Sequence, residues 1–99
     1  MELTSKQRAQ LRSLANGIDT ILIVGKDGIG DNLVTQANDA LESRELVKGK
    51  VLETCEYTPR EICEQLSKLT RSEQVQVIGS KFVLYLQKKK DSAYADLLK

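Results

Sequence analysis

Histidine and tryptophan are absent from this chain, and only two cysteines occur, Cys55 and Cys63. Without histidine the chain cannot build a Cys/His zinc site or a Cys/His nucleophile pair, and it lacks the commonest general acid and base. The cysteines are expected to be small buried hydrophobes, because the reducing compartment that the sequence indicates disfavours a disulfide. We therefore expect no catalytic residues, no metal and no cofactor, and an enzyme is the weakest function class.

Long apolar runs and the common nucleotide-binding motifs are missing as well. No run of about 18 apolar residues could span a bilayer, and residues 1–5 lack the basic-then-apolar pattern of a signal peptide. The glycines at 25, 28 and 30 do not form a Gly-x-Gly-x-x-Gly fingerprint, and no Gly-Lys-Ser/Thr loop follows. We expect a soluble, cytoplasmic protein that binds neither a membrane nor a small-molecule substrate.

The length and the apolar pattern predict one compact domain. Ninety-nine residues with 40% apolar content suffice for one modest core and not for two. Thr4-Ser5-Lys6-Gln7 and Thr58-Pro59-Arg60-Glu61 are helix-start signals of the capping-box type. The predicted order is α-β-α-β-α-β-β, with helices over about 5–16, 29–42 and 58–69, and strands over about 20–24, 45–52, 74–78 and 81–86.

This order predicts an α/β two-layer sandwich of the α+β type. The helices between successive strands indicate right-handed parallel crossovers, while Gly79-Ser80 favours a tight hairpin that adds one antiparallel strand. A mixed four-stranded sheet follows. We assign residues 1–87 to the domain and residues 88–99 to a basic C-terminal tail, whose segment 93–98 is either a short docking helix or a frayed end.

The formal net charge is only +1, but the charges are separated along the chain. Acidic residues crowd the segments 31–42 and 53–64. In the folded protein these charges form either one basic face backed by an acidic one or solvated charge on all sides, and the sequence leaves both alternatives open. The basic residues form three groups: Lys6, Arg8 and Arg12; Arg44, Lys48 and Lys50; and Lys81 with residues 88–90.

The loop Gly25-Lys26-Asp27-Gly28 lies between an apolar run at residues 21–24 and the start of a predicted helix. Glycines let backbone N–H groups approach a phosphate without interference from Cβ, and the following helix would offer free N–H groups and a positive dipole end. Two glycines at this spacing also occur in ordinary turns. The loop is therefore a candidate phosphate site whose support must come from the rest of the chain.

Five segments follow one another along the chain: residues 3–8, 11–15, 24–29, 45–48, and 75–79 with 83–85. In this order they resemble the CRM-domain (YhbY-like) family of RNA-binding proteins, in its single-domain bacterial form. The resemblance implies a fold like the C-terminal domain of translation initiation factor three, with an extra N-terminal helix. It also implies RNA binding without catalysis and association with the precursor of the large ribosomal subunit.

The resemblance maps the family's glycine loop onto residues 25–28 and its strand lysine onto Lys48. Lys48 and Lys50 share a strand face that should point away from the core, and Lys81 lies beside the hairpin turn. Gly49 stands where the family usually has a hydrophobe, and Leu86 stands where an arginine is frequent. The candidate RNA-binding residues are Gly25, Lys26, Asp27, Gly28, Lys48, Lys50, Lys81, Lys6, Arg8, Arg12 and Tyr85.

Aromatic residues are few, so base stacking is not expected to dominate recognition. Phe82 and Tyr85 have opposite strand phases, which assigns Phe82 to the core and Tyr85 to the outward face, as a stacking residue or a half-buried strand tyrosine. Asp27 and Asp31 put two carboxylates beside the glycine loop. Their repulsion of a phosphate would be on the order of 1 kcal/mol at water-like dielectric, which weakens a contact without abolishing it.

Two function hypotheses follow from these residues and from the resemblance. The leading one is a monomeric, non-catalytic protein that binds ribosomal RNA or pre-ribosomal particles and assists large-subunit assembly. The alternative is a protein-interaction module that docks on a ribosomal or assembly-factor protein through its acidic helices and its C-terminal tail.

Overall fold

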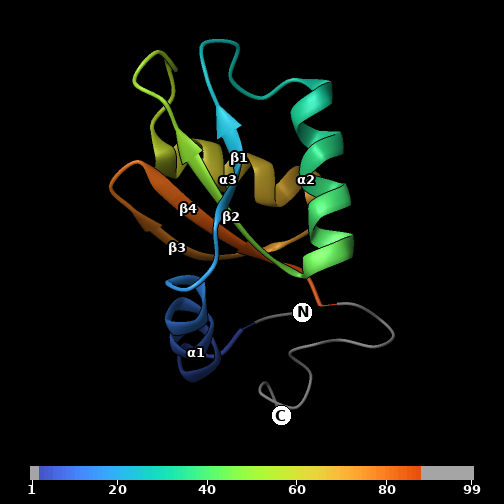
Figure 1. Cartoon of the computed structure of the whole chain (residues 1–99), viewed down its shortest axis with the longest axis vertical. Helices are drawn as coiled ribbons and strands as arrows, with labels where there is room; N and C mark the ends of the chain where they lie inside the picture. The colour runs from blue at the N-terminus through green and yellow to red at the C-terminus, as the bar shows by residue number, and fades with distance from the viewer. Residues whose placement is uncertain (1–2, 88–99) are drawn as a thin grey trace.

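The computed structural model describes residues 3–87, and the predicted tail at 88–99 lies outside the described residues. The order of elements is the one predicted (Figure 1). The helices are Ser5–Ala15 (α1), Asp31–Arg44 (α2) and Pro59–Thr70 (α3), and the strands are Thr20–Val24 (β1), Leu46–Val51 (β2), Glu73–Ile78 (β3) and Lys81–Tyr85 (β4).

Both predicted capping boxes are present. The Gln7 amide donates to Thr4 Oγ1 over 3.1 Å, and the Thr4 amide donates to Gln7 Oε1 over 2.9 Å. Thr58 and Glu61 make the same reciprocal pair at the start of α3, where Pro59 is the first helical residue. Each box satisfies two amide groups that a helix start leaves without intrahelical partners, which fixes where α1 and α3 begin.

The sheet is four-stranded and mixed, as predicted, with the strand order β1-β2-β4-β3. β1 and β2 are parallel, and β4 is antiparallel to both β2 and β3. β3 therefore runs parallel to β2, as its helical connection implies, but β4 lies between the two strands. This central position explains why residues 82–85 of β4 are all buried, since elements cover β4 on both faces of the sheet.

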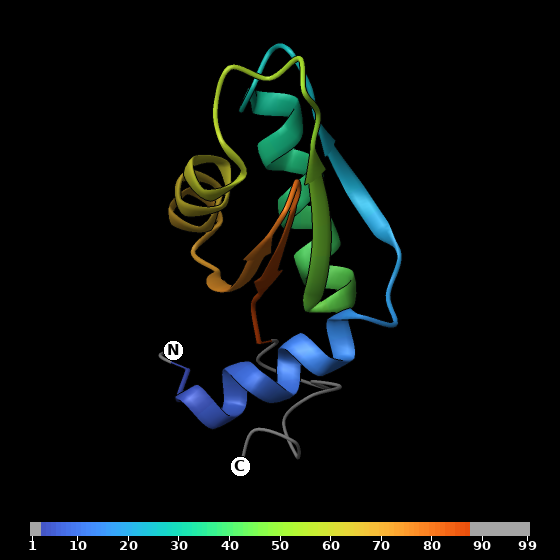
Figure 2. The ribbon, with the colours of Figure 1, turned by 90° about the vertical axis from the view of Figure 1, so that its left-hand side faces the viewer.

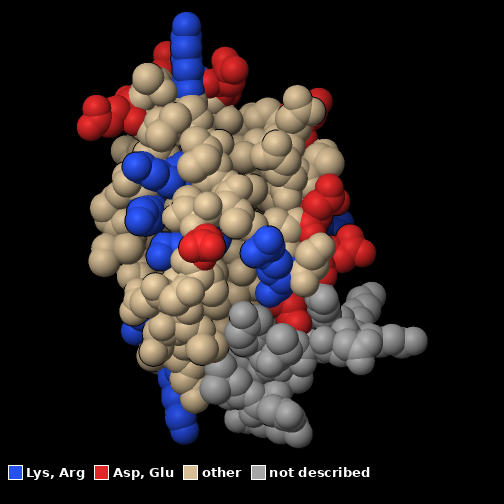
Figure 3. Space-filling view, in the orientation of Figure 1, with Lys and Arg blue, Asp and Glu red and all other residues tan. Residues whose placement is uncertain are grey.

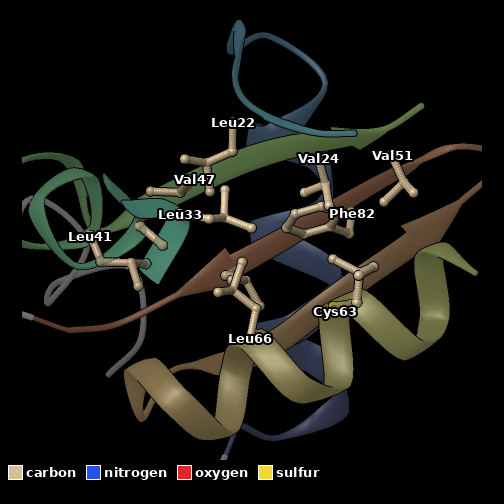
Figure 4. Packing of buried hydrophobic residues seen from close by; sticks show 12 residues of the cluster. Leu22, Val24, Leu33, Leu41, Val47, Val51, Cys63, Leu66 and Phe82 are labelled. Carbon is tan, nitrogen blue, oxygen red and sulfur yellow. The ribbon is translucent and has the colours of Figure 1, made fainter. Parts of the chain in front are cut away.

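Two helices and one face of the sheet enclose the main core. α2 and α3 pack on the face that alternate strand residues form, as Figure 4 shows for nine labelled side chains. Phe82 belongs to this core, as the sequence predicts. The buried residues of the main core are Leu22, Val24, Leu33, Ala37, Leu41, Val47, Val51, Ile62, Cys63, Leu66, Phe82 and Leu84.

Helix α1 covers part of the opposite face of the sheet (Figure 2). A second core lies beneath it, and Tyr85 is 0% exposed there. The prediction of Tyr85 as an outward-facing stacking residue is therefore wrong. Tyr85 does lie on the face that its strand phase indicates, but α1 closes that part of the face. The second core consists of Leu3, Leu11, Ala15, Leu46, Val75, Val83 and Tyr85.

Gly49 and Cys63 show how tightly the main core is filled. A Cβ on Gly49 would lie 2.7 Å from Cε1 of Phe82, the residue directly opposite on β4, so the ring occupies the space that a side chain would need. Cys63 is fully buried, and Cys55 is half-buried against the same core; both thiols are free. Burial raises the pKa of Cys63 to about 11, with a smaller opposing effect from Arg60.

Candidate nucleic-acid interface

The half of the sheet that α1 leaves uncovered carries a row of four side chains in register. Ile23 is the partner of Lys50, Lys50 of Lys81, and Lys81 of Ile78, on four neighbouring strands. Because cross-strand partners point to the same face, the row crosses the whole open surface. Ile23 is 53% exposed, Ile78 is 62% exposed, and both lysines are exposed. We call these four residues the lysine row.

The two central members of the lysine row carry like charges on directly opposite positions. Such a pair destabilises a sheet by a few tenths of a kcal/mol or more. Among residues 3–87 neither ammonium group has an acidic partner. An anion held between Lys50 and Lys81 would replace this repulsion by two attractions.

Lys48 shares the face of the lysine row, as predicted, but it is half-buried. Its Nζ donates to the carbonyl oxygen of Ala15 over 3.3 Å. This oxygen lies in the last turn of α1, where carbonyl groups lack intrahelical partners and the dipole favours a cation. Lys48 therefore holds α1 against the sheet. Its strand phase predicts a solvent-facing ammonium group, but this group is instead bound to the end of α1.

The glycine loop is a tight turn, in which the Gly28 amide donates to the Gly25 carbonyl over 3.0 Å. Gly28 has φ +64, a left-handed conformation that a residue with a Cβ rarely adopts. Lys26 and Asp27 at its tip are exposed. The Leu52 amide donates to the Val24 carbonyl over 2.8 Å, so the loop after β2 starts beside the glycine loop.

The helix after the glycine loop begins without a side-chain cap, because its N-cap residue is Gly30. The amide groups in its first turn are thus available to an anion, which the hypothesis of a phosphate site at the glycine loop requires. Asp31 in the first turn opposes this, since its carboxylate already occupies the positive end of the helix dipole. The loop therefore combines a tight turn and an uncapped helix start with one exposed lysine and two exposed carboxylates, those of Asp27 and Asp31.

The three basic residues of α1 do not lie beside the glycine loop. Figures 1 and 2 show α1 at one end of the long axis and the loops that follow β1 and β2 at the other. Arg8 is half-buried, and its Nε donates to the Gln74 carbonyl over 3.1 Å, which ties α1 to β3. Lys6 and Arg12 are exposed. An RNA that contacted both these residues and the glycine loop would have to extend along the whole molecule.

The charged side chains are only partly segregated in space. Figure 3 shows Lys and Arg gathered on the left of the visible face, over the sheet, with many Asp and Glu at the upper end and along the right-hand side. At the upper end Lys26 is accompanied by the exposed acids Asp27, Asp31, Glu53 and Glu56. Lys26 at the glycine loop thus has exposed acids nearby in the chain, whereas Lys50 and Lys81 have no acidic partner among residues 3–87.

Comparison with known proteins identifies the family of this chain. Residues 3–85 match the model of the CRS1/YhbY (CRM) domain. The chain belongs to the CRM family. It is 45% identical over 89 residues to the "Probable RNA-binding protein YqeI" of Bacillus subtilis, covering 90% of this chain and 93% of that one. It is also 31% identical to an "RNA-binding protein" of Haemophilus influenzae, over 84% of each chain.

A solved structure supports the CRM fold of this chain. The solution structure of the hypothetical protein SAV1595 from Staphylococcus aureus superposes with a TM-score of 0.79 at 48% sequence identity, covering 92% of this chain and 95% of that one. Within residues 3–87 of this CRM protein, no group of three or more His, Cys, Asp or Glu side chains could hold a metal ion. None of the helices there has the length and apolar character to cross a membrane.

One exposed residue of this CRM protein escaped the sequence analysis. Tyr57 lies in the loop after β2, is 46% exposed, and has its ring against Gly28. A signal for it existed in the sequence: the carboxyl ends of two parallel strands meet at one edge of a sheet, so the loops after β1 and β2 should be neighbours. Among residues 3–87, Tyr57 is therefore the exposed aromatic residue beside the glycine loop.

Proposed function

We propose that this CRM protein binds ribosomal RNA, or a precursor particle of the large ribosomal subunit, and assists the assembly of that subunit without catalysing a reaction. The observation that carries the proposal is the lysine row, which holds two like charges opposite each other on an open sheet face. The family and the names of two relatives, both described as RNA-binding, point to RNA as the anion. We propose that residues 1–87 act as this domain, in the cytoplasm and as a monomer.

The lysine row and the glycine loop would form one continuous track for an RNA backbone. Ile23 precedes Gly25 by two strand positions, about 7 Å at the usual rise of a strand. Lys50 and Lys81 would neutralise phosphates and release counterions, while the exposed isoleucines on either side exclude water and strengthen the charged contacts. The loop amides and the uncapped start of α2 would receive a further phosphate and fix the register of the RNA.

Binding of ribosomal RNA fragments to the double variant Lys50→Ala/Lys81→Ala tests this mechanism. Each lost phosphate contact lowers the slope of log K against log salt by about 0.7 to 0.9, so we expect a flatter salt dependence and an affinity at least tenfold lower at low salt. Lys68→Ala is the matched control, because Lys68 is exposed on α3, on the other face of the sheet, where it pairs with Glu64. Equal affinities for the double variant and the control would refute the mechanism.

Crosslinking on purified large-subunit precursor particles tests the finer part of the proposal. We expect crosslinks from the lysine row to ribosomal RNA nucleotides. Crosslinks confined to ribosomal or assembly-factor proteins would instead support the alternative, a protein-interaction module that uses the acidic helices. A protein that does not sediment with precursor particles at all would refute the assembly role while leaving RNA binding open to the salt titration.

A further inference from the structure

We infer that Tyr57 and the glycine loop form a binding site for one unpaired nucleotide. The loop amides that are not used in the Gly28–Gly25 hydrogen bond receive the phosphate, and the Tyr57 ring receives the base. The inference rests on the proposed RNA binding and adds the class of RNA that this end of the molecule takes. Among the aromatic residues that the structure describes, Phe82 and Tyr85 are fully buried, whereas Tyr57 is exposed. Of these three rings, that of Tyr57 is the one that a base can reach.

The ring of Tyr57 is held against the loop that would bind the phosphate. Its Cδ2 and Cε2 atoms lie 3.4 Å from the position that a Cβ on Gly28 would occupy. The glycine thus serves two purposes, since it permits the left-handed turn at φ +64 and leaves the ring room to approach the backbone. Nearly half of the residue's surface remains accessible, so the ring is supported on one edge and open elsewhere.

The backbone that carries Tyr57 is fixed by its neighbours. Thr58 is in an extended conformation, φ −71 and ψ 158, as expected of a residue before proline, and its capping box with Glu61 anchors it to α3. On the other side of the contact, the Gly28–Gly25 hydrogen bond closes the turn. A ring that is already positioned loses little conformational entropy when a base stacks on it, which favours binding.

The charges at this end favour stacking over purely electrostatic binding. Glu56 precedes Tyr57 directly, and Glu53 and Asp27 are exposed in the same two loops. These carboxylates oppose a phosphate, whereas stacking of a neutral base on an aromatic ring is not opposed by them. The lysine row would then supply the salt-dependent part of RNA binding, and Tyr57 a part that does not depend on salt.

Stacking requires a base that is not paired, so single-stranded and duplex RNA of the same sequence distinguish it. We measure the affinity of the full chain for both by fluorescence anisotropy, with Tyr57→Leu, which keeps an apolar contact on Gly28, and Tyr57→Phe, which keeps the ring. Loss of one stacked base weakens binding on the order of tenfold. We expect this loss for single-stranded RNA with Tyr57→Leu, near wild-type affinity with Tyr57→Phe, and no change for the duplex.

A tryptophan reporter gives a second readout. Because the chain has no tryptophan, Tyr57→Trp introduces a single tryptophan, whose emission should be quenched by single-stranded RNA. Leu69→Trp, at an exposed position on α3, is the control and should not be quenched. Chemical denaturation of each variant verifies that the fold is intact.

The outcomes separate this inference from the proposed function. Both the Tyr57 site and the lysine row are supported if Tyr57→Leu lowers RNA affinity by the same factor at every salt concentration while Lys50→Ala/Lys81→Ala reduces the salt slope. Wild-type affinity of Tyr57→Leu for single-stranded RNA, or an equal loss for the duplex, overturns the Tyr57 site and leaves the lysine row standing. No binding of any RNA by the wild-type protein overturns both.

Discussion

Exchanging one charge of the lysine row should make this protein more stable and a poorer RNA binder. In Lys81→Glu the like-charge pair with Lys50 becomes a pair of opposite charges on directly opposite strand positions. The substitution removes a repulsion and adds an attraction at the same place. If the row is kept for binding an anion, stability and binding must change in opposite directions.

The size of the stability change follows from the geometry of the pair. Directly opposite side chains on an antiparallel pair have Cβ atoms about 5 Å apart, and charge pairs there contribute about 0.2–1 kcal/mol each. Both residues are exposed, so water screens the pair and the lower half of that range applies to each of the two terms. We expect the free energy of unfolding to rise by about 0.5–1 kcal/mol, or a few degrees in Tm for a domain of this size.

Urea denaturation at low and high salt measures this gain, and an RNA titration measures the loss of binding. At about 1 M salt the Debye length falls to about 3 Å, and the gain should largely disappear. Lys68→Glu is the control because it changes the net charge equally; it places a like charge beside Glu64 on α3 and should slightly destabilise the protein without weakening RNA binding. If Lys81→Glu matched this control in both stability and binding, the functional reading of the row would be refuted.

Two further predictions concern the main core. Gly49→Ala should lower the free energy of unfolding by about 1–3 kcal/mol, because the new Cβ overlaps the Phe82 ring. Phe82→Leu should destabilise the Gly49→Ala variant less than it destabilises the wild type. If urea denaturation showed additive losses, the close contact between position 49 and the Phe82 ring would be contradicted. Burial raises the pKa of Cys63 from 9.0 to about 11, so the thiol of the unfolded chain loses its proton at a lower pH than that of the folded protein. The free energy of unfolding should therefore fall between pH 9 and 11, by about 2 kcal/mol at most. Cys63→Ala should flatten this decline, and a parallel pH profile of wild type and variant would show that another group is responsible.

The local signals in the sequence were sufficient for the elements of this fold. The capping boxes at Thr4 and Thr58 are short-range patterns of hydrogen bonding, and they set the starts of α1 and α3 where the structure has them. The alternation in residues 81–85 correctly put Phe82 in the core. These features depend on residues within a few positions of each other, so a single sequence contains all the information they need.

The candidate site was less accessible to sequence reasoning. The strand phase put Lys48, Lys50, Lys81 and Tyr85 on one face, and this is correct. It could not indicate that α1 crosses half of that face, burying Tyr85 and engaging Lys48 at the Ala15 carbonyl. The phase of a strand identifies a face of the sheet, but whether that face is open depends on a helix far away in the chain.

The sequence by itself determined the helices and strands, the mixed sheet and the family, because periodicity, caps and a fixed order of segments are local or linear properties. The tertiary structure alone decided that β4 lies between β2 and β3, that Lys50 and Lys81 face each other between two isoleucines, and that Tyr57 rests on Gly28. Lys50 and Lys81 are 31 positions apart in the chain, and Gly28 and Tyr57 are 29 positions apart. These contacts arise only when strand order and helix packing are fixed together, and no local pattern contains either.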